Sequence, residues 1–161
     1  MEPMTLYCAH YQPTTSSMGK RVPREAVVGL LKVVFDTEFV KAITINRYDI
    51  PVRGRVFVSQ SQPSRTSKGH WDYDFFHTIT DRVIEEVMEG SGTIVLINYV
   101  DQTYSVLRPP DIAWAIRHSS RPKGYGEQVT DFVVEETDEG HCLRPYDRFS
   151  PYRRSIEVKA I

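Results

Sequence analysis

The sequence predicts an α/β fold of the α+β type, in which a single mixed sheet is flanked by helices. Two observations lead to this class. From residue 23 onward the pattern indicates a helix, three or four strands, a helix, two strands and a further helix. The run "TIVLINYV" at residues 93–100 is almost wholly apolar, which is typical of a strand covered on both faces.

Three helices are predicted from apolar residues at helical spacing, at residues 23–38, 81–90 and 109–119. A proline suits the first turn of the first and third, because its missing N–H has no partner there. The second ends at Gly90. Its buried stripe is predicted to comprise Val83, Ile84, Val87 and Met88. Gly29 lies inside the first helix, where glycine costs up to about 1 kcal/mol relative to alanine, and this predicts a close approach of another backbone.

Strands are predicted from β-branched, aromatic and alternating runs. These runs are residues 39–45, 47–52, 55–61, 70–79, 93–100, 103–109, 129–137 and 155–161. The alternation in 70–79 places Phe75 on one face and Asp74 with Phe76 on the other. Between residues 142 and 154 the tail is predicted to be irregular, so the last run forms an extra C-terminal β segment.

Length and composition favour one folded domain. The chain has 161 residues, 40% hydrophobic and 25% charged, which is enough for a core without disulfide or metal staples. We expect a single domain over 1–161, with an N-terminal arm at 1–22, a core at 23–117, and a basic loop with C-terminal strands at 118–161.

Several classes of function are disfavoured. A net charge of −1 excludes a wholly cationic nucleic-acid binder, so nucleic-acid binding would need local patches. The first residues show no signal-peptide pattern, and no apolar run approaches the length of a membrane span; we therefore expect a cytoplasmic protein that does not enter membranes. Cys8 and Cys142 are interpreted as free thiols. Without a Gly-rich phosphate loop, a nucleophile elbow or a Cys/His ligand set, serine, cysteine and nucleotide-hydrolysing chemistries are disfavoured.

Two acidic residues within this element order point to a known family. Glu25 lies on the first predicted helix and Asp49 on the second strand, in "NRYDIPV". Residues 23–117 thus resemble the PD-(D/E)xK nuclease superfamily, which has the restriction-endonuclease-like fold with an αβββαβ core. The resemblance implies a metal-dependent endonuclease site in which Glu25 and Asp49 help to hold Mg²⁺, which activates water.

The sequence departs from the family on the third strand. The family carries Glu-x-Lys there, whereas this chain has Phe57 and Ser59. Gln60 and Lys68 are the candidate substitutes for the missing acid and lysine. The tail contains a closer match to the family motif, Glu157-Val158-Lys159 after Asp147. In the family a helix and further strands follow Glu-x-Lys, whereas here the sequence has only two more residues. We therefore predict an ordinary terminal strand there.

A second candidate metal site lies in "GHWDYDFFH". Asp72 and Asp74 are two residues apart and project from one face of the predicted strand, with His70 at the same parity and His77 on the other face. Together with Asp49, this pair completes the candidate metal ligands. The same residue pattern is also explained, without a metal, by an exposed strand face that lies over a core of aromatic residues.

Basic residues gather in the predicted loops. The candidate nucleic-acid-binding residues are Arg53, Arg55, Arg65, Arg117, Arg121 and Lys123. A further group lies in the tail and comprises Arg144, Arg148, Arg153 and Arg154. Arginine beside Ser, Gly and Tyr suits phosphate contacts and stacking on unpaired bases, although solvated surface charge explains it too.

Three functions follow from these observations. The first is a nucleic-acid-binding protein, with DNA favoured, that has a nuclease-like fold but no catalysis. The second is an active Mg²⁺-dependent DNA endonuclease with displaced ligands. The third is a non-enzymatic interaction or assembly protein, such as a virus or mobile element would encode, which forms homo-oligomers; its support is the nine tyrosines and the incomplete site. Carboxylates that converge around Asp49 would favour metal chemistry, and acids that point apart would favour the third function.

Overall fold

The computed structural model describes residues 20–65, 71–122 and 127–161. The helices within these ranges are α3 (Arg24–Val34), α4 (Asp81–Glu89) and α5 (Pro109–Ser119). The strands are β1 (Lys41–Ala42), β2 (Arg47–Ile50), β3 (Gly54–Ser61), β4 (Pro63–Arg65), β5 (Trp71–Thr80), β6 (Ile94–Asn98), β7 (Thr103–Leu107), β8 (Ser120–Pro122), β9 (Gln128–Thr137), β10 (Gly140–Arg144), β11 (Arg154–Ser155) and β12 (Lys159–Ala160). The α/β class is confirmed. The helices and longer strands follow the predicted order, whereas β4 and β8 are short strands in stretches that were not predicted as strands.

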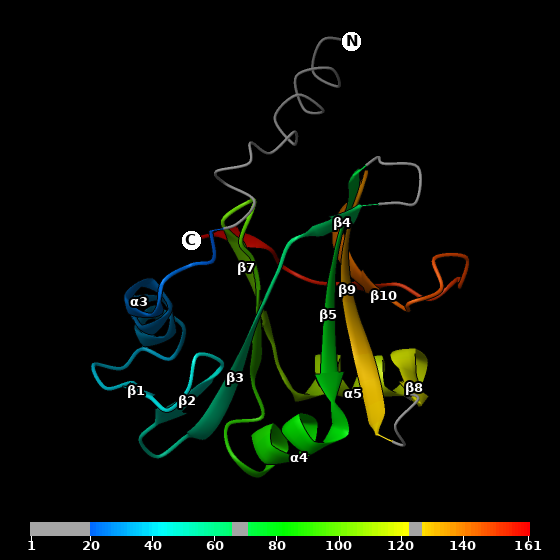
Figure 1. The fold of residues 1–161 in the computed structure, drawn as a ribbon. Coiled ribbons are helices and arrows are strands. Elements are labelled where there is room, and N and C mark those ends of the chain that lie inside the picture. The colour runs from blue at the N-terminus through cyan, green and yellow to red at the C-terminus, as the bar shows by residue number, and fades with distance from the viewer. Residues whose placement is uncertain (1–19, 66–70, 123–126) are drawn as a thin grey trace, which may run out of the picture.

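The expectation of a single sheet is wrong, because the strands form two sheets (Figure 1). Sheet A has the order β1-β2-β3-β6-β7-β12 and is mixed, since β3 and β6 run parallel. Sheet B has the order β11-β10-β9-β5-β4, with β8 also paired to β9. All five residues of β6 are buried, so both faces of sheet A need a cover, and sheet B contributes to one of them.

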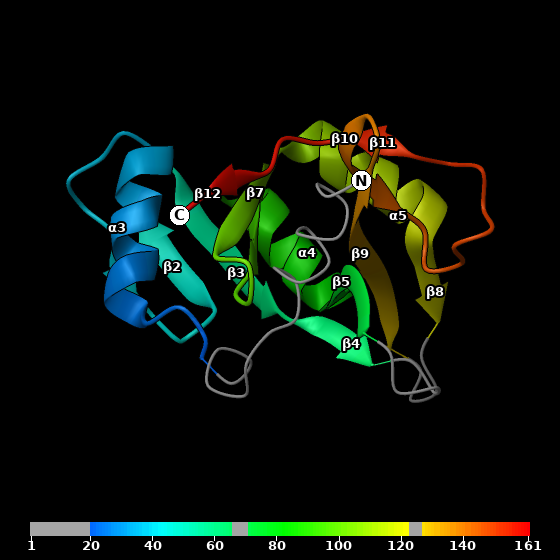
Figure 2. The same ribbon diagram turned by 90° about the horizontal axis from the view of Figure 1, so that it is seen from above.

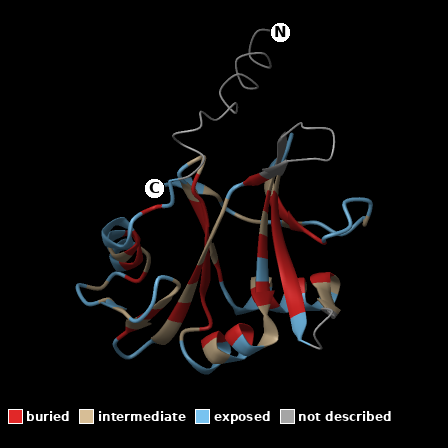
Figure 3. Cartoon of the chain, viewed as in Figure 1, coloured by how far each residue is buried: buried red, intermediate tan, exposed pale blue. Residues whose placement is uncertain are grey.

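The two covers of sheet A create two cores. On one face, Leu31 of α3 and Phe35, which follows its last residue, pack on Tyr48, Val56 and the neighbouring strands. On the other face, side chains of α4, α5 and the inner side of sheet B pack on the alternate residues of the same strands. Figure 3 shows buried residues along the strands of both sheets. Each aliphatic or aromatic side chain that is fully buried in this way stabilises the fold by about 1.5–3 kcal/mol.

Two stretches of chain connect the sheets. β3 in sheet A leads through Gln62 directly into β4 in sheet B. The C-terminal segment makes the return passage, from β11 beside β10 to β12 beside β7 (Figure 2). Ile156 and Val158, on that segment, pack against the core between the sheets.

The tail differs from its prediction. β10 begins in the predicted turn at Gly140, extends into the stretch predicted to be irregular, and pairs with β9. The predicted final strand at 155–161 is reduced to the two-residue pairings of β11 and β12, so Glu157 lies between strands. The strand predicted at 39–45 shrinks to β1. Met88 was predicted in the buried stripe of α4 but is 45% exposed.

The close approach of backbones occurs at a different glycine from the one predicted. A Cβ atom added to Gly29 would meet nothing within 4 Å. A Cβ on Gly90 would lie 2.6 Å from the backbone nitrogen of Arg55, and one on Gly54 would lie 2.8 Å from the Cα of Gly90. The end of α4 therefore packs directly on the β2–β3 hairpin at glycines on both sides.

The turn of that hairpin contains a strained valine. The N–H of Arg53 donates to the carbonyl of Ile50 at 3.0 Å, and Val52 is fully exposed with φ of 69°. A positive φ at this position is typical of a type II turn, where glycine is preferred, and a β-branched residue is strained there.

We expect Val52→Gly to raise the free energy of unfolding by about 0.5–1 kcal/mol. The left-handed conformation costs an L-residue about 1–2 kcal/mol, which exceeds the extra entropy that glycine loses on folding, about 0.5–1 kcal/mol. Urea denaturation measures the change. Val52→Ala keeps the left-handed strain and serves as the matched control, with a smaller gain expected. A less stable glycine variant would contradict the assignment.

Candidate functional site

Asp49 lies in a network of ion pairs on sheet A. Arg55, directly opposite on β3, donates from Nε and Nη2 to its two carboxylate oxygens. The Nη1 of Arg55 contacts Glu86 of α4 at 2.9 Å, and Arg47 reaches the same carboxylate at 3.0 Å. Hydrogen bonding from Arg55 lowers the pKa of the Asp49 carboxyl. Two acids and two arginines thus neutralise each other.

The other predicted partners of Asp49 lie elsewhere. Glu25 is exposed on α3. The amide of Gln60 accepts from the N–H of Val22 at 2.8 Å and donates to its carbonyl at 3.0 Å, so it fixes the chain before α3. Glu157 pairs with Lys159 at 3.4 Å.

These residues do not fit a magnesium ion. Both carboxylate oxygens of Asp49 are engaged by a guanidinium, and Phe57 offers no ligand atom. In the described ranges, no group of three His, Cys, Asp or Glu side chains could hold a metal. Lys68 lies outside the described residues. The predicted nuclease residues that the structure describes are therefore not assembled around Asp49.

The second predicted metal site is also divided. Asp74 lies on the outer face of sheet B, where it contacts Arg144 at 2.7 Å and Arg148 at 3.7 Å. It is thus remote in the fold from Asp49 on sheet A. His70 and the side chain of Asp72 lie outside what the structure describes, so their participation stays a prediction.

A buried polar chain between the sheets was missed by the sequence analysis. Ser59 Oγ lies 2.9 Å from Nδ1 of His77, and His77 Nε2 lies 3.0 Å from Oδ1 of Asn98. Asn98 Nδ2 in turn donates to Thr103 Oγ1 at 3.4 Å. The order is that of a nucleophile, a base and an orienting amide. The signal in the sequence was polar residues at inward positions of otherwise apolar strands.

The chemistry of the hydrogen-bonded residues Ser59, His77 and Asn98 favours a structural role. His77 is 1% exposed, and burial lowers its pKa to about 4. At pH 7 the imidazole is neutral and a weak base, whereas a general base works best with a pKa near the operating pH. Asn98 brings no negative charge that would stabilise an imidazolium. The three residues satisfy one another's hydrogen bonds inside an apolar space.

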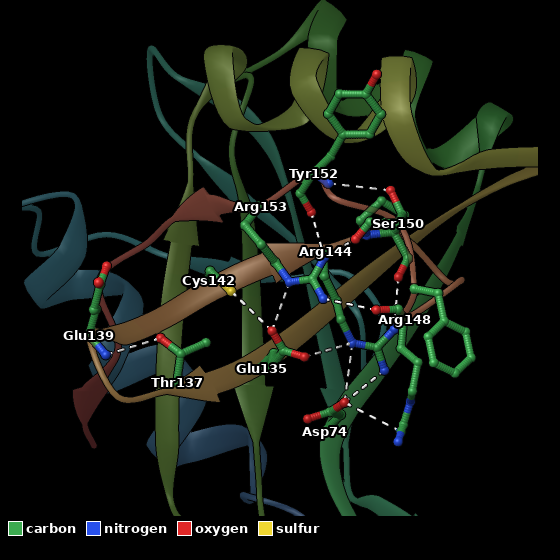
Figure 4. Close-up of polar contacts among 12 residues, drawn as sticks. Asp74, Glu135, Thr137, Glu139, Cys142, Arg144, Arg148, Ser150, Tyr152 and Arg153 are labelled. Atoms are coloured by element: carbon green, nitrogen blue, oxygen red, sulfur yellow. Dashed lines mark hydrogen bonds and ion pairs between the residues drawn. The ribbon is translucent and has the colours of Figure 1, made fainter.

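The most distinctive surface feature is the segment that joins β10 to β11, residues 145–153, here called the aromatic loop. It follows Arg144, the last residue of β10, which is 1% exposed. The guanidinium of Arg144 donates to Asp74 at 2.7 Å and to the carbonyls of Pro145 and Tyr146 at 2.8 and 3.0 Å. Figure 4 shows it beneath the loop, beside Asp74 and Glu135.

A second arginine holds the far end of the aromatic loop. Arg153 donates to the carbonyls of Ser150 and Tyr152 at 2.6 and 2.8 Å, and to that of Arg148 at 3.0 Å. Its Nε is fixed by Glu135 of β9 at 2.9 Å. The loop backbone is therefore anchored at both ends by guanidiniums that carboxylates of sheet B hold in place (Figure 4).

The aromatic loop displays rings rather than burying them. Phe149 is 89% exposed, Tyr146 56% and Tyr152 52%. Tyr152 stacks on His118 of α5 at 4.3 Å between ring centroids. Arg121 of β8 lies 4.8 Å over the ring of Tyr146. We define the aromatic-loop surface as the aromatic loop with Ile116, Arg117, His118 and Arg121.

Most charge on this surface is balanced. Arg121 pairs with Asp131, a carboxylate that is 1% exposed. Arg153 of the loop pairs with Glu135, and the two arginines that flank the loop, Arg144 and Arg154, pair with Asp74 and Asp111. The surface therefore presents aromatic rings beside neutralised guanidiniums and carries little excess positive charge.

The predicted nucleic-acid-binding residues are not gathered in one patch. Arg53 and Arg55 lie on the β2–β3 hairpin of sheet A, whereas Arg117 and Arg121 lie beside sheet B. Arg53 is exposed, with its guanidinium 5.7 Å over the ring of Phe35. The side chain of Arg65 and the whole of Lys123 lie outside the described part of the chain.

Comparisons with known protein families, with curated proteins and with solved structures found no match. In the part of the chain that the structure describes, none of the helices is long and apolar enough to cross a membrane. Cys142 is buried as a free thiol, and burial next to Glu135 raises its pKa to about 11; this describes an unreactive cysteine.

Proposed function

We propose that this protein acts by binding another protein through the aromatic-loop surface, and not by a metal-dependent reaction at Asp49. The observation that carries the proposal is a phenylalanine, Phe149, that is 89% exposed on a loop whose backbone is anchored at both ends. Aromatic side chains that are exposed to water raise the free energy of the unbound protein, and a partner that buries them removes this unfavourable contribution. Because the loop backbone is already anchored, less conformational entropy is lost on binding.

The composition of the surface supports a protein partner. Protein interfaces are enriched in Tyr, Phe and Arg and depleted in Lys and Glu, and Tyr, Trp and Arg supply most of the energetically dominant residues. The described part of the aromatic loop carries Tyr146, Phe149 and Tyr152 beside arginines and has no lysine. Because Arg121 and Arg153 already pair with carboxylates, burying these two guanidiniums does not leave isolated charges.

Nucleic acid is less well supported by the same surface. Affinity for a phosphate backbone comes mainly from neutralising phosphates with unpaired cations, and it falls with salt in proportion to their number. Here Arg121, Arg144 and Arg153 are neutralised within the protein. Binding to DNA or RNA through this surface would therefore be weak and would depend mainly on stacking.

The pairing of Asp49 supports the non-catalytic part of the proposal. A guanidinium on the carboxylate of Asp49 occupies the oxygens that a cation would need, and the third strand supplies Phe57 and Ser59 in place of an acid and a lysine. Ser59 is itself bonded to His77.

Site-specific photo-crosslinking tests the proposal. The photo-reactive residue is introduced as Phe149→p-benzoylphenylalanine and, as the matched control, as Phe39→p-benzoylphenylalanine, since Phe39 is 71% exposed away from the aromatic loop. In extracts of the native source we expect a discrete protein adduct from position 149 and none from 39. An excess of unlabelled wild-type protein should compete it away, whereas Phe149→Ala protein should not.

Two results would overturn the proposal. The first is equal adducts from both positions. The second is tight binding of DNA or RNA oligonucleotides, measured by fluorescence anisotropy, that Phe149→Ala abolishes. Cleavage of DNA with Mg²⁺ or Mn²⁺ that is lost in Asp49→Ala would overturn its non-catalytic part.

A further inference from the structure

A groove of about 320 Å³ lies between the end of α3 and β7; we call it the α3 groove. Part of its wall is aliphatic and consists of Val33, Val34 and Val106. Val34 and Val106 also pack against the core, whereas Val33 is 75% exposed. A volume near 300 Å³ is at the lower limit for ligand pockets. At about 30 Å³ per atom, the share of one molecule in liquid water, it holds roughly ten non-hydrogen atoms.

The charged residues of the α3 groove leave one cation unbalanced. Glu157 and Lys159 contact each other at 3.4 Å and so form a neutral pair. Arg108 is the third charged residue of the described lining. Within residues 20–65, 71–122 and 127–161, no carboxylate forms an ion pair with its guanidinium. The described lining therefore has a net charge of +1, which a ligand with one negative charge would neutralise.

The guanidinium of Arg108 is also held in position. Its Nη1 donates to Thr93 Oγ1 at 3.4 Å, and its Cζ lies 5.6 Å from the centroid of the Phe35 ring. The backbone N–H of Arg108 donates to Asp111 at 3.0 Å. A guanidinium has five N–H donors, so several remain for the two oxygens of a carboxylate. Because the side chain is already fixed, less entropy is lost when a ligand binds.

We propose that the α3 groove binds a small carboxylic acid with an apolar body. The carboxylate is bound by Arg108, and the body lies against Val33, Val34 and Val106. A phosphate monoester fits less well, because it carries up to two negative charges and the lining has one unbalanced cation. A neutral apolar molecule would cover the guanidinium without giving it a partner, which is unfavourable.

Titration of the full chain with octanoate, an aliphatic carboxylate of this size, tests the proposal. Methyl NMR spectra should show saturable shifts for Val33, Val34 and Val106, with a dissociation constant on the order of 0.1–1 mM for so small a ligand. Val52 is the internal control, because it is fully exposed on the β2–β3 turn and should not shift. Octan-1-ol has the same chain length without the charge and should bind about tenfold more weakly or worse.

Two arginine variants test the anchor. Arg108→Gln should lower the affinity for octanoate by about tenfold or more, as expected for the loss of a charged hydrogen bond. Arg53→Gln is the matched control: Arg53 also lies over the ring of Phe35, at 5.7 Å, but does not line the α3 groove. Its loss should leave the affinity nearly unchanged. Both arginines are exposed, so both variants should fold, and circular dichroism checks this.

Three results would each show that the proposal is wrong. They are an absence of shifts at the three groove valines, equal affinities for octanoate and octan-1-ol, and equal losses of affinity in the two arginine variants. If Arg108→Gln does not fold, the comparison of octanoate with octan-1-ol on the wild type decides alone. The outcome is independent of the aromatic-loop surface, because α3 and β12 lie toward one side of the molecule and β10 and β8 toward the other (Figure 2).

Discussion

Replacing Arg144 by alanine is expected to lower the free energy of unfolding by about 3 kcal/mol. Breaking a buried ion pair by removing one partner costs about 3–5 kcal/mol, because the remaining charge stays buried without compensation. Asp74 and Glu135 have side chains that are 17% and 20% exposed. They retain contacts with Arg148 and Arg153, which is why we place the effect at the lower end of that range.

Urea denaturation measures this loss, and Arg154→Ala is the matched control. Arg154 makes one ion pair, with Asp111, and its side chain is 36% exposed; such pairs contribute about 0.2–1 kcal/mol. Hydrogen exchange adds a local measurement, because Arg144 also holds the carbonyls of Pro145 and Tyr146. Amides of the aromatic loop should exchange faster in Arg144→Ala. Equal losses in the two variants would show that Arg144 is not the anchor of the loop.

Acid is expected to destabilise the protein through His77, by about 3 kcal/mol once the pH is below about 4. Burial lowers the pKa of this imidazole from 6.5 to about 4. Between these values the unfolded chain binds a proton that the folded protein does not, so stability falls as pH falls. The slope approaches 1.4 kcal/mol per pH unit within the window from pH 6.5 to 4, and above pH 6.5 this group contributes no pH dependence.

Urea midpoints measured at intervals from pH 7.5 to 4 test the prediction. His77→Gln is the comparison, because glutamine can hydrogen-bond to Ser59 and Asn98 but does not titrate. We expect the difference in stability between wild type and variant to shift by about 3 kcal/mol across the window in favour of the variant at low pH. Parallel pH profiles would contradict a buried, neutral His77. Carboxylates titrate equally in both proteins, so they cancel in the difference.

The helices were predictable because their signals are local. Apolar spacing, a starting proline and a stop glycine located α3, α4 and α5 within a few residues. The same holds for β6, whose unbroken apolar run predicted cover on both faces. The sequence could not show that this cover is partly a second sheet, because strand pairing between β5 and β9 joins residues 49 to 59 positions apart.

The candidate site was less predictable, because the role of a charged side chain depends on which residues lie next to it in the folded protein. Asp49 was expected to hold a metal, and its environment depends on Arg55 across the hairpin and Glu86 on a helix. Arg144 belonged to a tail predicted to be irregular, and no local pattern predicts that two carboxylates and two carbonyls would bury it.

By itself, the sequence determined the element order, the α/β class and the absence of a complete Glu-x-Lys on the third strand, since each depends on neighbouring residues and their periodicity. Only the tertiary structure decided that Asp49 is neutralised by Arg55, that His77 is buried in a polar chain, and that the aromatic loop leaves the ring of Phe149 exposed. The physical reason is that hydrogen bonds and ion pairs at these positions join residues from distant elements, and their partners are fixed only when the two sheets pack.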